Sequence, residues 1–314
     1  MQHPFRFGVM ANHTTPMPSS GRQWADFCKK VEDLGYASLA LSDHLWGQPA
    51  PVPAIAAAAA ATSQLRVGAL MFCNDFRHPA ILAKEVATLD VLADGRLDLG
   101  IGAGWKDTDY QQTGIAKDRA GVRIERLAES VSVIKGLLGD EPFTFDGQHY
   151  SIDGLDNQPK PIQRPHPPLI MGGGGPKVLR LAAEHAQIVS VNRSLRDGEV
   201  DRGARRNSSA EATDEKITWV REVAGARWKE IEINMVVPDV VITAQRRRAV
   251  TELAQRFGLT PEEVEENPHV WVGTVDQICD DLMARRERFG ASFVTVVAEH
   301  FEASAPVIER LAGR

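Results

Sequence analysis

Eight short apolar segments, each followed by sequence of helical character, alternate along this 314-residue chain. Such regular alternation predicts an α/β fold in which parallel strands and helices repeat, and eight units favour a closed (β/α)8 barrel of TIM type over an open sheet. The predicted strands are residues 5–10, 38–42, 65–72, 96–101, 169–171, 187–191, 231–237 and 293–297. The predicted helices are residues 21–34, 52–62, 79–92, 123–138, 178–185, 214–223, 244–257 and 275–289.

Two segments depart from this alternation. One barrel needs about 250 residues, so we predict a single domain over residues 1–314 with two excursions. Residues 141–165 contain Asp146-Gly147 between two aromatic-containing runs, and this pattern indicates an inserted hairpin. Residues 192–212 are polar and aperiodic and follow the sixth strand, so we predict a mobile lid on the rim. A solvated excursion without a role is the alternative.

Composition narrows the class of partner and the compartment. The net charge of -6 and the pI near 5.9 argue against nucleic acid or an anionic membrane as partner. Cys28, Cys73 and Cys279 are few, odd in number and widely spaced, which is typical of a reduced compartment. The first residues show no signal peptide, and the alanine run at 56–61 is too short to span a bilayer. We therefore predict a soluble cytoplasmic protein.

Alternating glycines mark the end of the fourth predicted strand. Gly100, Gly102 and Gly104 directly precede Trp105. Glycine has no Cβ and lets a flat ligand approach the backbone, and an indole beside it offers an aromatic wall. The spacing does not match the dinucleotide fingerprint G-x-G-x-x-G. In a barrel this loop would face a flat cofactor at the rim, with a tight strand-to-loop turn as the alternative.

Polar residues also follow two neighbouring strands. The second strand ends in Asp43 and His44, and a histidine at a strand's carboxyl end is a candidate for proton transfer. A hydrogen-bonded structural histidine is the alternative. After the third strand, helix capping and a pair between Arg77 and Asp75 are the simpler interpretation. Cys73 lacks any neighbour that would activate a thiolate, so we predict a buried small residue.

The fifth strand runs into four glycines and then Pro176 and Lys177. Backbone N–H groups at a helix N-terminus, with a lysine nearby, predict a phosphate site. The spacing is not that of a Walker loop. No metal-binding or serine-hydrolase motif is present, so we predict no metal site. The candidate phosphate ligands are Gly172, Gly173, Gly174 and Gly175.

These motifs, in this order, resemble the bacterial luciferase-like monooxygenase superfamily, and within it the branch of coenzyme F420-dependent oxidoreductases. The resemblance covers essentially the whole chain and implies a TIM-type barrel, a homodimer, and a deazaflavin or FMN bound at the carboxyl ends of the strands. The residues that carry it are 42–44, 74–79, 89–96, 100–105, 159–161, 172–175, 272–274 and 305–307.

The resemblance also implies roles for individual residues. His44 handles protons beside the reactive ring, and Asp43 contacts the cofactor. A non-proline cis peptide bond falls by register at Leu70-Met71, behind the ring. The best-studied sugar-phosphate dehydrogenases of this branch carry a catalytic glutamate where this chain has Trp105, so sugar-phosphate oxidation is not expected. The remaining cofactor-binding candidates are Gly102, Ala103, Gly104, Trp105, the glycines at 172–175, and Asn192.

We therefore predict an oxidoreductase that uses coenzyme F420 to transfer hydride to or from a small organic substrate. The first alternative is an FMN-dependent luciferase-like monooxygenase, supplied with reduced flavin by a separate reductase. The second is a non-catalytic flavin-binding relative. Neither the substrate nor the direction of hydride transfer follows from the sequence.

Overall fold

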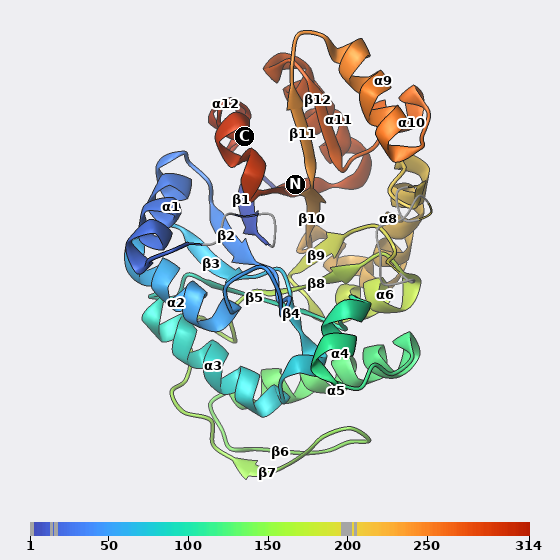
Figure 1. The fold of residues 1–314 in the computed structure, drawn as a ribbon. Coiled ribbons are helices and arrows are strands. Elements are labelled where there is room, and N and C mark those ends of the chain that lie inside the picture. The colour runs from blue at the N-terminus through green and yellow to red at the C-terminus, as the bar shows by residue number, and fades with distance from the viewer. Residues whose placement is uncertain (1–2, 13–14, 16–17, 196–202, 204–205) are drawn as a thin grey trace.

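Eight parallel strands form a closed barrel in the computed structural model, which describes residues 3–12, 15, 18–195, 203 and 206–314 (Figure 1). Each strand pairs with the next in chain order, and the first pairs with the last through Arg6↔Phe293 to Met10↔Val297. The predicted (β/α)8 fold is confirmed. The barrel strands are β1 (Arg6–Ala11), β2 (Ser38–Leu41), β3 (Arg66–Ala69), β5 (Leu97–Gly102), β8 (Leu169–Gly173), β9 (Ile188–Val191), β10 (Glu232–Val237) and β13 (Ala291–Val297).

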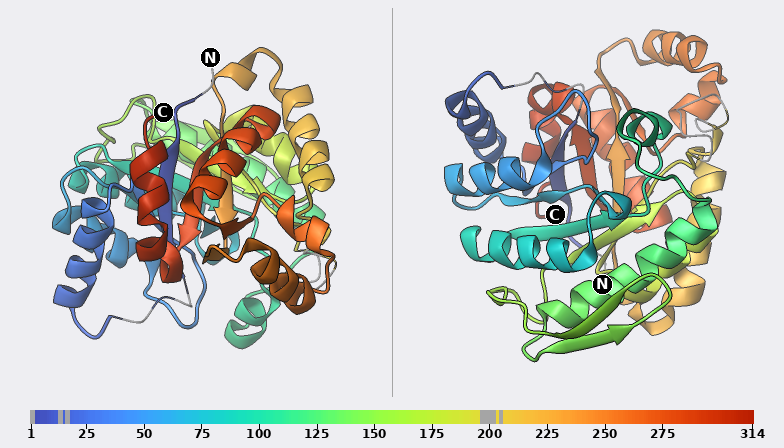
Figure 2. Two further views of the ribbon diagram at one scale, coloured as in Figure 1. Left: turned by 90° about the horizontal axis from the view of Figure 1, so that it is seen from above. Right: turned by 60° about the horizontal axis from the view of Figure 1, so that its bottom comes forward.

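Helices surround the barrel on its outside (Figures 1 and 2). Two predicted helices have local signals at their ends. Pro79 occupies the first position of the helix that starts there, and Gly290, in the αL conformation, follows the last residue of the helix that ends at Phe289. The helix after the last strand was not predicted. The helices packed around the barrel are α1 (Gly21–Asp33), α2 (Pro51–Ala61), α3 (Pro79–Leu92), α5 (Ala120–Leu138), α6 (Pro176–His185), α8 (Ala210–Ala224), α11 (Val275–Phe289) and α12 (Phe301–Leu311).

The predicted hairpin is confirmed as β6 (Phe143–Asp146) and β7 (Ser151–Leu155), which pair antiparallel. It lies against the outside of the barrel near α5 (Figure 2). The Glu129 carboxylate on α5 accepts backbone hydrogen bonds from Gln148 and His149, each at 2.8 Å. A single acidic side chain therefore fixes the turn of the hairpin to the barrel.

A second, smaller sheet extends the barrel between β10 and α11. It consists of β11 (Asp239–Ile242) and β12 (Val270–Gly273), which pair in parallel. The helices α9 (Arg246–Phe257) and α10 (Pro261–Glu265) pack on it through an apolar cluster of their own. This unit was not predicted, although the helix predicted at residues 244–257 is confirmed as α9.

Much of the predicted lid at 192–212 lies outside the described residues. Its described ends touch each other, because the Ser194 N–H donates to the Asn207 side-chain oxygen at 2.7 Å. Helix α8 begins at Ala210, where the Ser209 hydroxyl accepts from the Ala212 N–H at 3.2 Å. The predicted helix start at residue 214 was therefore wrong by four residues.

Charged residues close the amino-terminal end of the barrel. Arg6 lies 2.6 Å from Glu232 and 3.6 Å from Asp98, and Arg66 lies 2.7 Å from Asp98. The Arg6 guanidinium also stacks 3.9 Å above the Phe293 ring. Arg6, Glu232, Asp98 and Arg66 lie at or near the starts of their strands, so this charged cluster occupies the end of the barrel opposite the carboxyl ends of the strands.

We expect Arg6→Ala to lower the free energy of unfolding by about 3 kcal/mol, because Glu232 and Asp98 then remain largely buried with one cation fewer. Urea denaturation measures the change. Arg310→Ala is the control, since Arg310 pairs with Asp276 in an exposed position and its removal should cost less than about 1 kcal/mol. Equal losses in the two variants would contradict a structural role for the charged floor.

Candidate active site at the carboxyl-terminal mouth

The predicted site residues follow five different barrel strands at the same end. His44 comes after β2, Met71 after β3, Trp105 after β5, Gly175 after β8 and Asn192 after β9. In a closed parallel barrel the carboxyl ends of all strands surround one mouth. The fold therefore brings residues from five loops to one rim.

His44 forms a short contact with a buried carboxylate. Its Nδ1 lies 2.7 Å from Oδ2 of Asp109, whose side chain is 2 % exposed. The other oxygen, Oδ1, accepts the Leu45 backbone N–H at 3.2 Å. Asp109 lies on the short helix α4 (Asp107–Thr113), which follows the glycine loop. Asp109 was not predicted, and its only sequence signal is an acidic residue in the first turn of that helix.

Two indoles flank the His44 ring. The Trp105 ring meets it edge-on, with centroids 5.5 Å apart and an interplanar angle of 86°. The Trp46 ring lies 6.2 Å away and is 36 % exposed, and Leu45 beside it is 49 % exposed. The predicted aromatic wall after the glycine loop thus stands directly beside the predicted proton-transfer residue.

Asp43 points away from His44, into the protein. Its carboxylate accepts from Arg77 at 2.6 Å and from the Cys73 backbone N–H at 2.9 Å. The pair between Arg77 and Asp75 was predicted wrongly. Asp75 instead accepts from Arg126 on α5 at 3.0 Å and from the Tyr110 hydroxyl. Asp43 therefore ties the end of β2 to β4 (Phe72–Cys73).

Cys73 is the buried small residue that its sequence context predicted. Burial raises the pKa of its thiol to about 12, so a thiolate does not form near neutral pH. Its Sγ lies 3.7 Å from the Tyr110 hydroxyl. The positive φ of 75° at Gly104 and the closeness of Tyr110 and Cys73 to any Cβ placed there together require glycine at this position.

The peptide bond between Leu70 and Met71 is cis, as predicted. The Met71 side chain lies along the glycine loop, and a Cβ on Gly102 would stand 3.5 Å from Met71 Cε. Met71 and Val236 are half-buried members of an apolar cluster in the barrel interior, together with Met10 and Ala40. The mouth of the barrel therefore has an apolar floor beneath the glycine loop.

The loop from Gly102 to Trp105 is fixed from behind by two cations. Arg123 on α5 donates to the carbonyl oxygen of Ala103 at 3.3 Å and also to that of Gly104. Lys117 donates to the carbonyl oxygen of Trp105 at 3.1 Å. Neither cation was predicted, because both contacts depend on how α5 and its preceding turn fold back.

The four glycines at 172–175, two at the end of β8 and two after it, differ in their surroundings. Gly172 and Gly174 pack against the backbone of Ser190 and of residues 193–194, where any Cβ would collide. Gly175 is the N-cap of α6 and has no heavy atom within 4 Å of where a Cβ would stand. Only Gly175 therefore leaves the helix N-terminus accessible to an anion.

Asn192 ends a chain of buried polar groups. Its side-chain N–H donates to the Ser190 hydroxyl at 2.9 Å, and Ser190 donates to Asn234 Oδ1 at 2.7 Å. The Asn234 amide donates in turn to the Thr295 hydroxyl at 2.9 Å. The chain fixes the orientation of the Asn192 amide at the rim.

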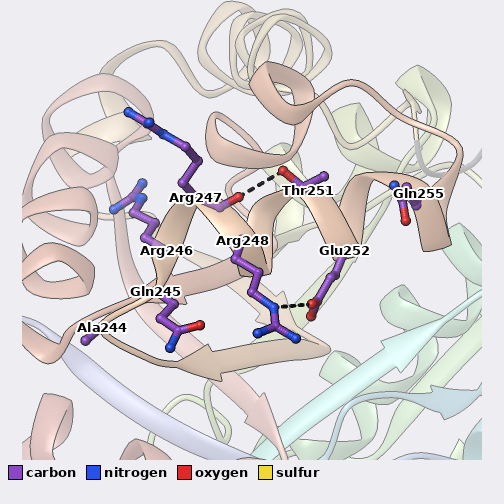
Figure 3. Close-up of a pocket in the computed structure, with 8 residues that line it drawn as sticks. All are labelled: Ala244, Gln245, Arg246, Arg247, Arg248, Thr251, Glu252 and Gln255. Atoms are coloured by element: carbon purple, nitrogen blue, oxygen red, sulfur yellow. Dashed lines mark hydrogen bonds and ion pairs between the residues drawn. The ribbon is translucent and has the colours of Figure 1, made fainter.

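A separate concave surface lies on α9 and the residues just before it (Figure 3). It is lined by one helix and its approach, and Arg248 on it pairs with Glu252 at 2.8 Å. It contains none of the predicted site residues. Among the residues that the structure describes, no three His, Cys, Asp or Glu side chains are placed to bind a metal ion. None of the described helices is long and apolar enough to cross a membrane.

Comparison with known proteins identifies the family. Residues 3–224 match the model of the family described as Luciferase-like monooxygenase, which is more than half of the chain. The chain belongs to the luciferase-like monooxygenase family. The predicted resemblance is thus confirmed.

Curated relatives of this luciferase-like protein include two kinds of enzyme. An F420-dependent glucose-6-phosphate dehydrogenase of Microbacterium testaceum (strain StLB037) is 33% identical over 195 residues, which are 60% of this chain and 56% of that protein. An FMNH(2)-dependent dimethylsulfone monooxygenase of Pseudomonas putida is 32% identical over 131 residues, 42% of this chain and 35% of that protein. The chain spans about half the length, or less, of these relatives.

Solved structures agree on the fold. An F420-dependent secondary alcohol dehydrogenase in complex with an F420-acetone adduct has a TM-score of 0.75 at 18% identity, covering 98% of both chains. A coenzyme F420 dependent tetrahydromethanopterin reductase from Methanopyrus kandleri has a TM-score of 0.75 at 20% identity, also covering 98% of both chains. At these identities the similarity establishes the barrel.

One buried histidine at the rim of this luciferase-like protein makes stability depend on pH. The His269 Nδ1–H donates to the carbonyl oxygen of Val236 at 2.8 Å, and burial lowers the pKa of the ring to about 3. Unfolding exposes the ring and returns its pKa to about 6.5. The unfolded state therefore takes up a proton first as the pH falls, so this contribution to stability is complete above about pH 6.5 and declines below it.

We expect the free energy of unfolding to fall below pH 6.5 with a contribution from His269 of about 1.4 kcal/mol per pH unit. His269→Gln should make the decline shallower by that amount, since glutamine does not titrate. Urea denaturation at about pH 7.5, 6, 5 and 4.5 measures both slopes. Identical slopes for the two proteins would contradict the assignment.

Proposed function

We propose that this protein is an oxidoreductase that uses coenzyme F420 to transfer hydride to or from a small organic substrate at the mouth of the barrel. The observation that carries the proposal is the position of His44, held by a buried carboxylate beside the glycine loop and above the apolar floor. The curated relatives named as F420-dependent dehydrogenases support the deazaflavin over other flat cofactors.

The residues at the mouth fit a cofactor with a flat ring and an anionic tail. The half-buried Met71 offers apolar surface for a ring, and Gly102 beside it presents no side chain. Gly175 leaves the N-terminus of α6 open to a phosphate, and Lys177 follows two residues later. We therefore propose Met71, Gly102 and Gly175 as cofactor-binding residues, with Leu70, Ala103, Gly104, Trp105, Gly172, Gly173, Gly174 and Asn192 shaping the surrounding surface.

Bound F420 would supply the hydride acceptor or donor. The residues of the chain would hold the cofactor and exchange the accompanying proton. His44 exchanges the proton that accompanies hydride transfer. The rings of Trp46 and Trp105 pack against the imidazole. Asp43 is a positioning residue in this proposal, because its carboxylate is occupied by Arg77 and the Cys73 N–H. An imidazole held in a fixed position at the site suits general acid–base catalysis.

The residue type at position 105 limits the class of substrate that we propose. The resemblance places a catalytic glutamate at this position in sugar-phosphate dehydrogenases, whereas this chain presents an indole packed against His44. An indole neither donates to nor accepts a proton from a sugar hydroxyl during its oxidation. We therefore propose a substrate other than a sugar phosphate, acted on by a cytoplasmic homodimer.

FMN-dependent oxygenation is the second candidate. It is favoured by the FMNH(2)-dependent dimethylsulfone monooxygenase that is 32% identical over 131 residues. In that case the enzyme would take reduced flavin from a separate reductase, and the same apolar floor would hold the flavin ring. The two candidates differ in the cofactor that the purified protein binds.

We expect the purified protein to bind coenzyme F420 more tightly than FMN. Parallel titrations of the full chain, followed by quenching of its intrinsic tryptophan fluorescence, measure both dissociation constants. Micromolar affinity for FMN without binding of F420 would overturn the proposal and move the protein to the monooxygenase class.

His44→Ala should lower kcat by about 10²- to 10⁴-fold while the variant still folds and binds cofactor, since general acid–base catalysis contributes on that scale. His149→Ala, on the hairpin outside the barrel, is the control and should retain its activity. An unchanged kcat in His44→Ala would reduce His44 to a structural residue.

A further inference from the structure

We infer that Asp109 is a positioning residue that fixes the tautomer of His44, with the proton on Nδ1 and the lone pair on Nε2. The structural part of this inference stands on geometry alone. Its consequence for turnover rests on the proposed function, in which His44 exchanges a proton.

The contact between the two residues joins distant parts of the chain. His44 follows β2, and Asp109 lies 65 residues later on α4. An ionised carboxylate only accepts hydrogen bonds, so the imidazole nitrogen 2.7 Å away must be the one that carries the proton. The proton on Nδ1 leaves Nε2 as the basic nitrogen.

The second oxygen of Asp109 fixes which oxygen of the carboxylate faces His44. Oδ1 accepts the Leu45 backbone N–H at 3.2 Å, so the carboxylate binds two consecutive residues after β2 through its two oxygens. A carboxylate satisfies both donors at once. An asparagine amide in the same place has one oxygen that accepts and one NH₂ group that donates. The fixed Leu45 N–H would donate to that oxygen, which leaves the NH₂ group to face His44.

Two other described carboxylates close to His44 or Asp109 in the sequence pair with cations. Asp43, the sequence neighbour of His44, pairs with Arg77, and Asp107 on the same helix as Asp109 pairs with Lys117. Two described rings that pack against His44, those of Trp105 and Trp46, carry no charge. Within the part of the chain that the structure describes, Asp109 is thus the carboxylate in contact with His44.

Asparagine at position 109 should therefore reverse the tautomer. Its oxygen would face the Leu45 N–H and its NH₂ group would face Nδ1, which must then accept and leave the proton on Nε2. A wrong tautomer has a larger effect on turnover than on binding, because it removes the basic nitrogen from the reacting side while the site keeps its shape.

The direct test is nitrogen NMR of the histidine rings in the intact wild-type protein, with the His44 signal assigned by its loss in His44→Ala. Ring nitrogens with and without a proton resonate in separate regions. We expect a protonated Nδ1 and a bare Nε2 in the neutral ring. A neutral His44 with its proton on Nε2 would overturn the inference, and this measurement needs neither cofactor nor substrate.

Asp109→Asn tests the cause. We expect the His44 tautomer to reverse, kcat to fall by about 10²- to 10⁴-fold, and KM and the F420 dissociation constant to change by less than about threefold. Asp107→Asn is the matched control, since it removes the same charge from the same helix turn at a 42 % exposed side chain. It should keep the wild-type tautomer and turnover.

The outcomes separate this inference from the proposed function. A reversed tautomer in Asp109→Asn with unchanged turnover of an F420-dependent reaction would overturn the inferred consequence of Asp109 for turnover. A wild-type tautomer in folded Asp109→Asn would overturn its positioning role. If the wild-type protein does not bind F420 but the tautomer of His44 is reversed in Asp109→Asn, the proposed cofactor is contradicted. The positioning of His44 by Asp109 is then still supported.

Discussion

Closure of the barrel through β1 and β13 is the constraint on which the site depends. Five consecutive residue pairs, from Arg6↔Phe293 to Met10↔Val297, join the first strand to the last. Because every barrel strand runs in the same direction, closure gathers all strand ends at one mouth. The Arg6, Glu232 and Asp98 cluster occupies the opposite end. The chemistry-bearing loops therefore share one face and one entrance.

Two buried carboxylates then shape the loop that carries His44. Asp43 holds the end of β2 to β4 through Arg77 and the Cys73 N–H. Asp109 holds the next two residues from the other side through His44 and Leu45. Removing either partner leaves a buried charge unpaired, which is costly. The imidazole is therefore fixed by interactions that reach from β4 and from α4, and two indoles pack against it.

The sequence was sufficient for several elements whose bounds are decided by local chemistry. The first residues of α3 and α11 were predicted correctly. Pro79 begins α3, and the capping box of Thr274 and Gln277 sets the start of α11. Asp146-Gly147 marked the hairpin, and eight apolar runs specified the barrel. The resemblance, rather than any local rule, located the cis bond at Leu70-Met71.

Tertiary contacts explain what the sequence did not disclose. Asp109 lies in the first turn of a seven-residue helix, where an acidic residue is ordinary, and only the fold brings it to His44. Arg77 had a near neighbour in Asp75, yet the packing of α5 and Tyr110 draws Asp75 away. Strands β11 and β12 are four residues each and separated by two helices, so neither alternation nor spacing marked their pairing.

A crystal structure of the protein with coenzyme F420 tests the central claim most directly, namely that the mouth of the barrel beside His44 is a deazaflavin site. We predict that the deazaflavin ring lies against Leu70-Met71 and Gly102, with its reactive edge toward His44 and its phosphate toward Gly175. A ring bound at any other surface, such as the concave face of α9, would contradict the account.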